Sequence, residues 1–297
     1  MILLVDLDGV VYRASVPVPG VAALLAARAA RGDEIVYVTN NSMHYRADYV
    51  ARLAALGAPV TADRVVSSPR ATALYLREQR PTAARVLAIG GGGLVRELRD
   101  VGLQVVTASH AATRMAKEGI DGVAAAEAPD VVVVGLDPQL TYLRLAAAAD
   151  CIRTGAAFIA TNRDPLYPTE RGLQPGAGSI VAALEVATGR LPTIIGKPGP
   201  LLLETAAHVA GGDVRDAVMI GDSVVTDVAA AVAVGARSVL MLTGVTTPDQ
   251  AAAIPPGRRP TAVVADASEL ATVLDELAAG GPRSNAVEPA VEAGGRG

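Results

Sequence analysis

The sequence contains few aromatic residues: they make up 3% of its 297 residues, with no Trp and one Phe. A hydrophobic core must therefore consist mainly of Ala, Val, Leu and Ile, and a hydrophobic content of 51% is ample for one large or two ordinary domains. The one cysteine, Cys151, excludes an internal disulfide and fits a reducing cytoplasm. We expect Cys151 to be a small core residue, because no neighbour in the sequence would stabilise its thiolate.

The chain also lacks an excess of basic residues and any long apolar run. A formal net charge of −4 argues against nucleic-acid binding, which needs a basic face. No apolar run approaches the roughly 18 residues of a membrane span, and no basic region precedes the apolar N-terminal run as in a signal peptide. We therefore expect a cytoplasmic protein with no nucleic-acid partner and no membrane partner.

Short apolar runs alternate with helical stretches from one end of the chain to the other. Runs without polar alternation are typical of parallel strands that are covered on both faces, so the pattern predicts an α/β protein. The expected strands are 2–5, 34–38, 85–89, 104–106, 131–134, 157–159, 193–195, 217–220, 238–242 and 262–264. The expected helices are 21–31, 46–56, 69–79, 93–101, 140–153, 178–188, 200–210, 226–234 and 267–278.

Two polar segments that contain proline, 78–84 and 188–192, divide the chain. The block between them has an ordinary domain size and its own alternation of strands and helices. We therefore predict a discontinuous core domain of residues 1–81 and 191–279, with a second domain of residues 82–190 inserted into it. The Gly/Pro/Glu-rich tail, 280–297, is expected to be disordered.

Two carboxylates, Asp6 and Asp8, directly follow the apolar run 2–5 and lead into Gly9. Like charges this close repel and raise each other's pKa, so a positive group must compensate for them. A divalent metal is the expected compensator, and Mg²⁺ prefers such oxygen ligands.

Three more polar segments follow predicted strands: Thr39-Asn40-Asn41-Ser42, Gly196-Lys197-Pro198, and Gly221-Asp222-Ser223 with Thr226-Asp227. In open parallel sheets, ligands bind at the carboxyl ends of the strands, which is where all of these segments fall. Each segment alone has an ordinary interpretation as a turn, a helix cap or a solvated lysine. Together they supply carboxylates, hydroxyl and amide donors, and a cation at one edge of the sheet. Turns and helix caps alone do not explain this combination.

Together with Asp6-Leu7-Asp8-Gly9, these segments resemble the motifs of the haloacid dehalogenase superfamily of phosphohydrolases. TNNS followed far downstream by GKP is similar to subfamily IIA, the NagD-like nitrophenylphosphatase branch, which includes phosphoglycolate, pyridoxal phosphate and glycerol phosphate phosphatases. The resemblance covers residues 1–279 with order and spacing preserved. It implies a Rossmann-like parallel-sheet core with an inserted α/β cap domain of the C2 type.

The resemblance also implies roles for the carboxylates. Asp6 would attack phosphorus and form an aspartyl-phosphate, and Asp8 would protonate the leaving group and then activate water. Mg²⁺ would be held by Asp6, by Asp8 through its backbone carbonyl, and by Asp222. Asp227 would hold the site residues in position without binding the metal itself. Position 223, where relatives often carry Asn or Arg, is Ser here, which leaves the metal carboxylate intact.

In the same way, the Thr39 hydroxyl and the backbone amides of Asn40 and Asn41 would hold phosphate oxygens. With Lys197 they would stabilise negative charge in the transition state, the main task in phosphoryl transfer.

The inserted block would be the cap, which excludes water and selects the substrate. Related caps project a TNxD segment over the active site, so Asn162 and Asp164 are the candidate specificity residues; capping of the next turn is the alternative. Arg163 would either contact an acidic substrate or be solvated. We expect a tight turn at Gly90–Gly93. For His44 we expect a helix-surface position; the alternative is a position near the active edge, because it follows Thr39 by five residues.

The sequence thus predicts an enzyme: a Mg²⁺-dependent phosphatase that acts on a small phosphorylated metabolite. Glycerol phosphate or phosphoglycolate is the expected substrate, with pyridoxal phosphate and nucleotides as alternatives; a chain this poor in aromatic rings offers few of them to stack on pyridoxal phosphate. A regulatory or binding module that retains the pocket but has little activity, and phosphoryl transfer to an acceptor other than water, remain open. Caps in this branch often pair, so the resemblance also implies a homodimer through the cap.

Overall fold

The computed structural model describes residues 1–79, 84–118, 128–169 and 172–280. Its first sheet is entirely parallel, with β1 at the centre between β13 and β4. In spatial order the strands are β15 (Ala262–Val264), β14 (Arg237–Met241), β13 (Ala217–Gly221), β1 (Ile2–Asp6), β4 (Glu34–Thr39) and β5 (Val65–Ser67). The carboxyl ends of β1, β4 and β13 therefore lie side by side.

Helices cover both faces of this sheet, because alternate strand residues point to opposite sides and nearly all are apolar. Leu3 and Val5 pack against α1 (Val21–Ala30), α2 (Arg46–Ala55) and α12 (Ala267–Ala278). Leu4 packs on the other face with α3 (Ser68–Gln79), α9 (Leu201–Val209) and α10 (Ala229–Val234).

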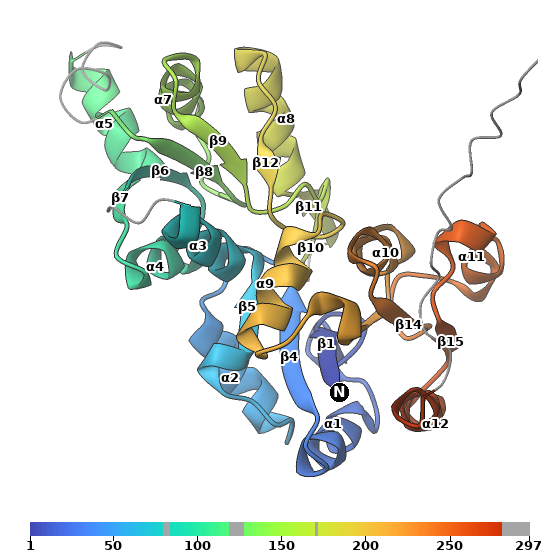
Figure 1. Cartoon of the computed structure of the whole chain (residues 1–297). Helices are drawn as coiled ribbons and strands as arrows, with labels where there is room; N and C mark the ends of the chain where they lie inside the picture. The colour runs from blue at the N-terminus through green and yellow to red at the C-terminus, as the bar shows by residue number, and fades with distance from the viewer. Residues whose placement is uncertain (80–83, 119–127, 170–171, 281–297) are drawn as a thin grey trace, which may run out of the picture.

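A second parallel sheet lies between β5 and β13 in the chain and forms a separate body in space (Figure 1). In spatial order its strands are β12 (Thr193–Ile194), β9 (Ala157–Ala160), β8 (Val131–Val134), β6 (Arg85–Ile89) and β7 (Gln104–Thr107). Helix α4 (Gly92–Asp100) covers the face turned toward the first body. The other face is covered by α5 (Ala108–Glu118), α7 (Tyr142–Arg153) and α8 (Ala177–Thr188).

The remaining elements are short. Two antiparallel hairpins are formed by β2 (Tyr12–Arg13) with β3 (Val16–Pro17), and by β10 (Leu166–Thr169) with β11 (Gly172–Pro175). The short helical segments are η1 (Ala62–Arg64), η2 (Val214–Asp216), a π-helical turn η3 (Val224–Val228), α11 (Pro248–Ala252) and η4 (Pro256–Arg258). None of the helices in the described part of the chain is long and apolar enough to cross a membrane.

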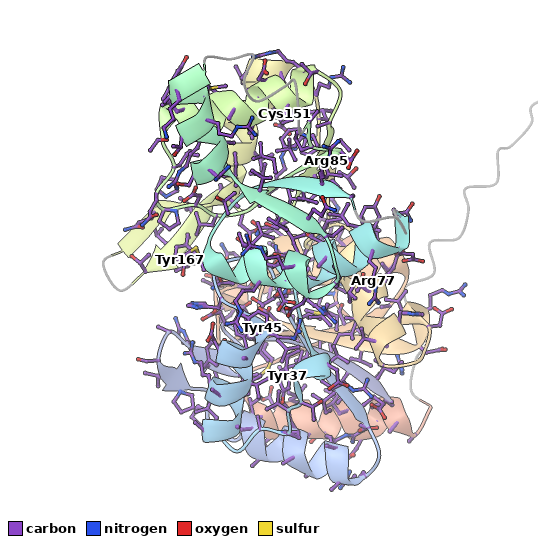
Figure 2. The ribbon with its side chains drawn as sticks, turned by 90° about the vertical axis from the view of Figure 1, so that its left-hand side faces the viewer. Tyr37, Tyr45, Arg77, Arg85, Cys151 and Tyr167 are labelled. Carbon is purple, nitrogen blue, oxygen red and sulfur yellow. The ribbon has the colours of Figure 1, made fainter. Side chains whose placement is uncertain are left out.

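The two bodies share one apolar cluster, in which Leu4 and Val38 of the first sheet join Val86 and Val133 of the second. A polar contact lies beside it, where Tyr45 of the first body donates a hydrogen bond to the Asp100 carboxylate at 2.6 Å (Figure 2). The second body is thus packed onto the first rather than tethered to it by linkers alone.

The α/β class, with a parallel Rossmann-like core and an inserted α/β cap, is confirmed. The predicted cap end at residue 190 falls short of the last cap strand, because β12 pairs with β9 after it. The boundary predicted near residue 82 falls within 80–83, and the tail predicted to be disordered falls almost wholly within 281–297, both outside the described residues. The predictions missed β5, α5, α11 and the two hairpins, and the helix predicted at 226–234 begins instead as η3.

Candidate active site

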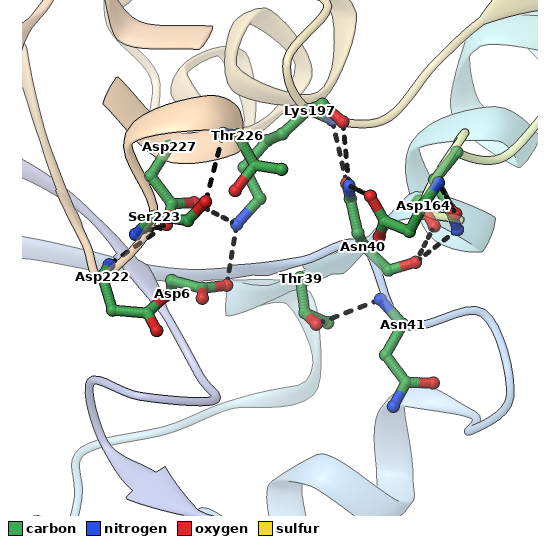
Figure 3. Close-up of polar contacts among 12 residues, drawn as sticks. Asp6, Thr39, Asn40, Asn41, Asp164, Lys197, Asp222, Ser223, Thr226 and Asp227 are labelled. Carbon is green, nitrogen blue, oxygen red and sulfur yellow. Dashed lines mark hydrogen bonds and ion pairs between the residues drawn. The ribbon is translucent and has the colours of Figure 1, made fainter. Parts of the chain in front are cut away.

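The amino group of Lys197 lies between two buried carboxylates at the edge where β1 and β13 end (Figure 3). Its Nζ donates to Asp6 Oδ1 at 2.7 Å and to Asp227 Oδ1 at 2.6 Å. Burial alone would lower the pKa of Lys197, but the negative charges of Asp227 and Asp6 outweigh it and raise this pKa. Lys197 is therefore a fixed cation in the site.

Asp227 also joins this cation to the backbone after β13. Its Oδ2 accepts hydrogen bonds from the backbone N–H groups of Asp222 at 3.1 Å and Ser223 at 3.0 Å. The π-helical turn η3 places Asp227 over these two amides; such turns occur often at functional sites. Asp227 is 1% exposed and both its oxygens are occupied, which suits a residue that orients its neighbours.

Asp222 is held in a narrow space between two glycines. A Cβ atom at Gly9 would lie 2.2 Å from Asp222 Oδ2, and one at Gly244 would lie 1.8 Å from it. Glycine is therefore required at both positions for the carboxylate to fit. The same oxygen accepts the Val245 N–H at 2.7 Å, yet burial, followed by the charge of Asp227, raises the pKa of Asp222 to about 6.

The carboxylates of Asp6, Asp222 and Asp227 form a compact group, with one oxygen from each lying within 4.8 Å of the others. One ammonium group faces these three carboxylates, so negative charge is in excess. Burial raises the pKa of Asp6 well above its usual value, and Asp227 and Asp222 add to the rise against the opposing charge of Lys197. A cluster of hard oxygen donors with unbalanced negative charge fits a bound Mg²⁺ ion.

The segment after β4 is fixed by the Asn40 side chain. Asn40 Oδ1 accepts the Lys197 backbone N–H at 2.8 Å, and Asn40 Nδ2 donates to the Lys197 carbonyl at 2.8 Å and to Asp164 Oδ1 at 3.2 Å. Thr39 Oγ1 accepts the Asn41 N–H at 3.1 Å, and Asn41 Oδ1 in turn accepts the Met43 N–H. In this arrangement the Asn40 side chain aligns its neighbours.

The predicted cap residues do reach the core site. Asn162 Nδ2 donates to the Asn40 carbonyl at 2.7 Å, and Asn162 Oδ1 accepts the Asp164 N–H at 3.1 Å. Burial raises the pKa of the Asp164 carboxyl, against the opposing hydrogen bond from Asn40. Asn162 therefore caps its own turn, as the alternative predicted, and also joins cap to core, while a role of Asn162 and Asp164 in specificity stays a prediction.

A cavity of about 870 Å³ opens between the two bodies over these residues. Asp6, Thr39, Lys197, Asp222 and the two cap residues line it, and so does Asp8, whose side chain is exposed to the cavity. Partial burial raises the pKa of Asp8, against the opposing charge of Arg52. All the predicted site side chains except that of Asp227 line this cavity.

The cavity also contains side chains that the sequence did not reveal: Tyr12, Arg13, Tyr49, Arg52 and Tyr167. Tyr167 comes from the hairpin β10–β11 of the cap (Figure 2). His44 precedes α2 and lines the cavity, so its predicted position on a helix surface is wrong. Arg163 pairs with Glu185 and does not line the cavity, which leaves the solvated alternative for it.

Two family models match the chain. One, described as haloacid dehalogenase-like hydrolase, covers residues 3–104, and a second model of HAD-like hydrolases covers residues 194–270. A D-glycerol 3-phosphate phosphatase of Mycobacterium tuberculosis is 39% identical over 90% of this chain and 70% of its own length. The chain belongs to the haloacid dehalogenase-like hydrolase family.

Other members of the haloacid dehalogenase-like family agree with this assignment. An acid sugar phosphatase of Staphylococcus aureus is 36% identical over 82% of this chain and 87% of its own length. Among solved structures, a p-nitrophenyl phosphatase from Archaeoglobus fulgidus has a TM-score of 0.80 at 30% identity, over 92% of this chain and 98% of that one. The M. tuberculosis glycerol phosphate phosphatase, solved in complex with magnesium, has a TM-score of 0.77 at 39% identity, over 91% of this chain and 75% of that one. The predicted family and class of activity, a phosphatase, are confirmed.

Proposed function

We propose that this chain hydrolyses the phosphomonoester of a small metabolite, with Asp6 as nucleophile. One observation carries the proposal: Asp6 faces the cavity with Lys197 bound to one of its oxygens, and Asp8 lines the same cavity two residues on. A carboxylate nucleophile divides a difficult displacement into two easier steps, formation and hydrolysis of an aspartyl-phosphate.

Asp8 acts as the general acid and base in this proposal. Its raised pKa favours the protonated form that the leaving oxygen needs, and its accessible position lets a water molecule reach it in the second step. Lys197 stays charged next to Asp6 and stabilises negative charge on the transferred group.

The cluster of Asp6 and Asp222, with the backbone carbonyl of Asp8, would hold Mg²⁺. Bound there, Mg²⁺ would neutralise phosphate charge and help to align the phosphoryl group. Asp227 holds Lys197 and the backbone around Asp222 in place, so we assign it to positioning rather than to the metal.

Thr39 and the amides of Asn40 and Asn41 are proposed to bind phosphate oxygens. Thr39 Oγ1 accepts one hydrogen bond from Asn41, which leaves its own proton to donate into the cavity. The Asn40 side chain uses both its groups on Lys197 and Asp164, so only its backbone serves the phosphate. Asn162 and Asp164 close the cavity from the cap side.

For the substrate, we propose glycerol phosphate or phosphoglycolate. The M. tuberculosis relative is named for glycerol 3-phosphate, and a two- or three-carbon phosphate fits the cavity with room for water. Action in the cytoplasm, without nucleic-acid or membrane partners, and a homodimer through the cap, stay predictions of the sequence.

The test is turnover of p-nitrophenyl phosphate, with and without Mg²⁺, by the wild type and by Asp6→Asn. We expect Mg²⁺-dependent release in the wild type and a loss of more than about 10³-fold in kcat in the variant. Radiolabelled phosphate from the substrate should stay on acid-quenched wild-type protein but not on Asp6→Asn. Asp249→Asn, an exposed carboxylate change on α11, is the matched control and should keep full activity.

Other outcomes would support the alternatives. If the folded wild type released no phosphate from any phosphomonoester with Mg²⁺ present, a binding module would be the better description. Faster product formation on addition of an alcohol would indicate phosphoryl transfer to an acceptor other than water. Retained turnover by Asp6→Asn would refute the assignment of the nucleophile.

A further inference from the structure

Arg52 is a cation inside the cavity that the proposed chemistry does not use. It lies on α2, and its guanidinium carbon is 3.4 Å from the ring centroid of Tyr12. Tyr12 is 1% exposed, so the surface on which the guanidinium stacks is fixed. Stacking of this kind holds the planar group in one orientation and leaves its N–H edges free to bind.

The Arg52 guanidinium is not paired with a carboxylate of the described residues. Two other arginines are paired, Arg46 with Glu97 and Arg163 with Glu185. Within the described residues, Arg52 forms no ion pair, although it is half-buried and lines the cavity. A half-buried cation without a partner is suited to an anionic ligand.

The position of Arg52 relative to Asp8 says which part of a ligand it would contact. Asp8 and Tyr12 are paired in an isolated β-bridge and Arg52 stacks on the Tyr12 ring, so Arg52 and Asp8 line adjoining parts of the cavity. Asp8 must reach the leaving oxygen, and the phosphoryl group lies beyond it at Asp6. The carbon part of the leaving group therefore extends toward Arg52.

We propose that Arg52 is a specificity-determining residue that binds a carboxylate on the leaving group. The preferred substrates are then phosphomonoesters of small hydroxy acids rather than of neutral polyols. The inference rests on the proposed phosphatase function and deepens it. Guanidinium and carboxylate form two parallel charge-assisted hydrogen bonds, which a hydroxymethyl group at the same place does not match.

The other cations of the cavity are less suited to this role. Lys197 is occupied by Asp6 and Asp227. Arg13 lines the cavity but is exposed, with no stacking partner to orient it among the described residues. His44 lies edge-on to Tyr49 at 5.8 Å, and its imidazole lacks the two parallel N–H groups with which a guanidinium binds a carboxylate.

The experiment compares kcat/KM for phosphoglycolate and for glycerol 3-phosphate, which differ in having a carboxylate or a neutral polyol, with p-nitrophenyl phosphate as the reference. In Arg52→Gln the ratio of phosphoglycolate to glycerol 3-phosphate should fall about 10-fold to 100-fold, the value of one charge-assisted pair. Turnover of p-nitrophenyl phosphate should fall much less. Arg52→Lys, which keeps the positive charge but not the planar guanidinium with its paired N–H groups, should give an intermediate ratio.

Arg77→Gln is the matched control, because Arg77 is an exposed arginine of α3 (Figure 2) that does not line the cavity; its ratio should equal that of the wild type. An unchanged ratio in Arg52→Gln, or a fall in Arg13→Gln alone, would overturn the inference. Arg52→Gln removes the contact with Tyr12 and breaks no ion pair among the described residues, so a thermal melt should show it folded. A wild type that hydrolyses none of the three esters would refute the phosphatase function itself, a different result from an unchanged ratio.

Discussion

Asp222→Asn should make the metal-free protein more stable, although it removes a proposed metal ligand. Ionised Asp222 lies in a buried group with Asp6 and Asp227 and only one ammonium to balance them. Asparagine has nearly the same shape, and its oxygen can keep the hydrogen bond from Val245. The change therefore removes repulsion and desolvation of a charge without leaving a cavity.

The magnitude follows from the pKa of Asp222, which burial raises from 3.8 to about 6. Because the folded protein holds this proton more tightly than the unfolded chain, stability falls as pH rises from about 4 to about 6. A one-unit difference in pKa between the two states corresponds to about 1.4 kcal/mol. Above pH 7 ionised Asp222 thus costs about 3 kcal/mol, of which the variant should recover about 1–3 kcal/mol.

The assay is urea unfolding in the presence of a chelator at pH 8, 5 and 4. The stability gained by Asp222→Asn should be largest at pH 8, smaller at pH 5 and absent at pH 4. Addition of Mg²⁺ should stabilise the wild type by mass action but not the variant. Glu276→Gln, the same charge change on the exposed face of α12, should stay within about 0.5 kcal/mol of the wild type at each pH.

Two results would refute this reasoning. A variant less stable than the wild type at pH 8 in chelator would mean that Asp222 supports the fold rather than opposing it. Equal stabilisation of both proteins by Mg²⁺ would mean that the ion binds elsewhere.

Further predictions concern the contact between cap and core. Glu97 is fully buried and pairs with Arg46, so Glu97→Ala should cost about 3–5 kcal/mol of unfolding free energy in urea titrations; a loss below about 1 kcal/mol would show that the pair is dispensable. A Cβ atom at Gly93 would lie 2.5 Å from the carbonyl carbon of His44, so Gly93→Ala should cost about 1–3 kcal/mol and raise KM for p-nitrophenyl phosphate. Gly92→Ala, with nothing within 4 Å, is its control and should be neutral; equal effects of the two changes would contradict the clash.

Strands that are buried on both faces could be predicted accurately from the sequence, because such burial requires nearly every residue to be apolar. The strands β6, β8 and β15 agree with their predicted limits to the residue, because short continuous apolar runs between helices are typical of parallel strands covered on both faces. Prediction from the sequence failed for β5, which has three residues, and for the exposed hairpin β10–β11, which carries no apolar alternation and contains a proline. Elements of that kind are stabilised by their neighbours and leave little pattern in the chain.

For the site, sequence alone determined that carboxylates, a lysine and hydroxyl and amide donors follow strands of one parallel sheet, since strand ends collect at one edge whatever lies between them. Only the tertiary structure decided the pairing: Lys197 contacts Asp6 across 191 residues, and Asp227 completes the contact from a π-helical turn. Arg52, one arginine on an amphipathic helix, gave no signal until α2 placed it over Tyr12. Such contacts depend on how segments far apart in the sequence pack together, and no local pattern in a single sequence encodes that packing.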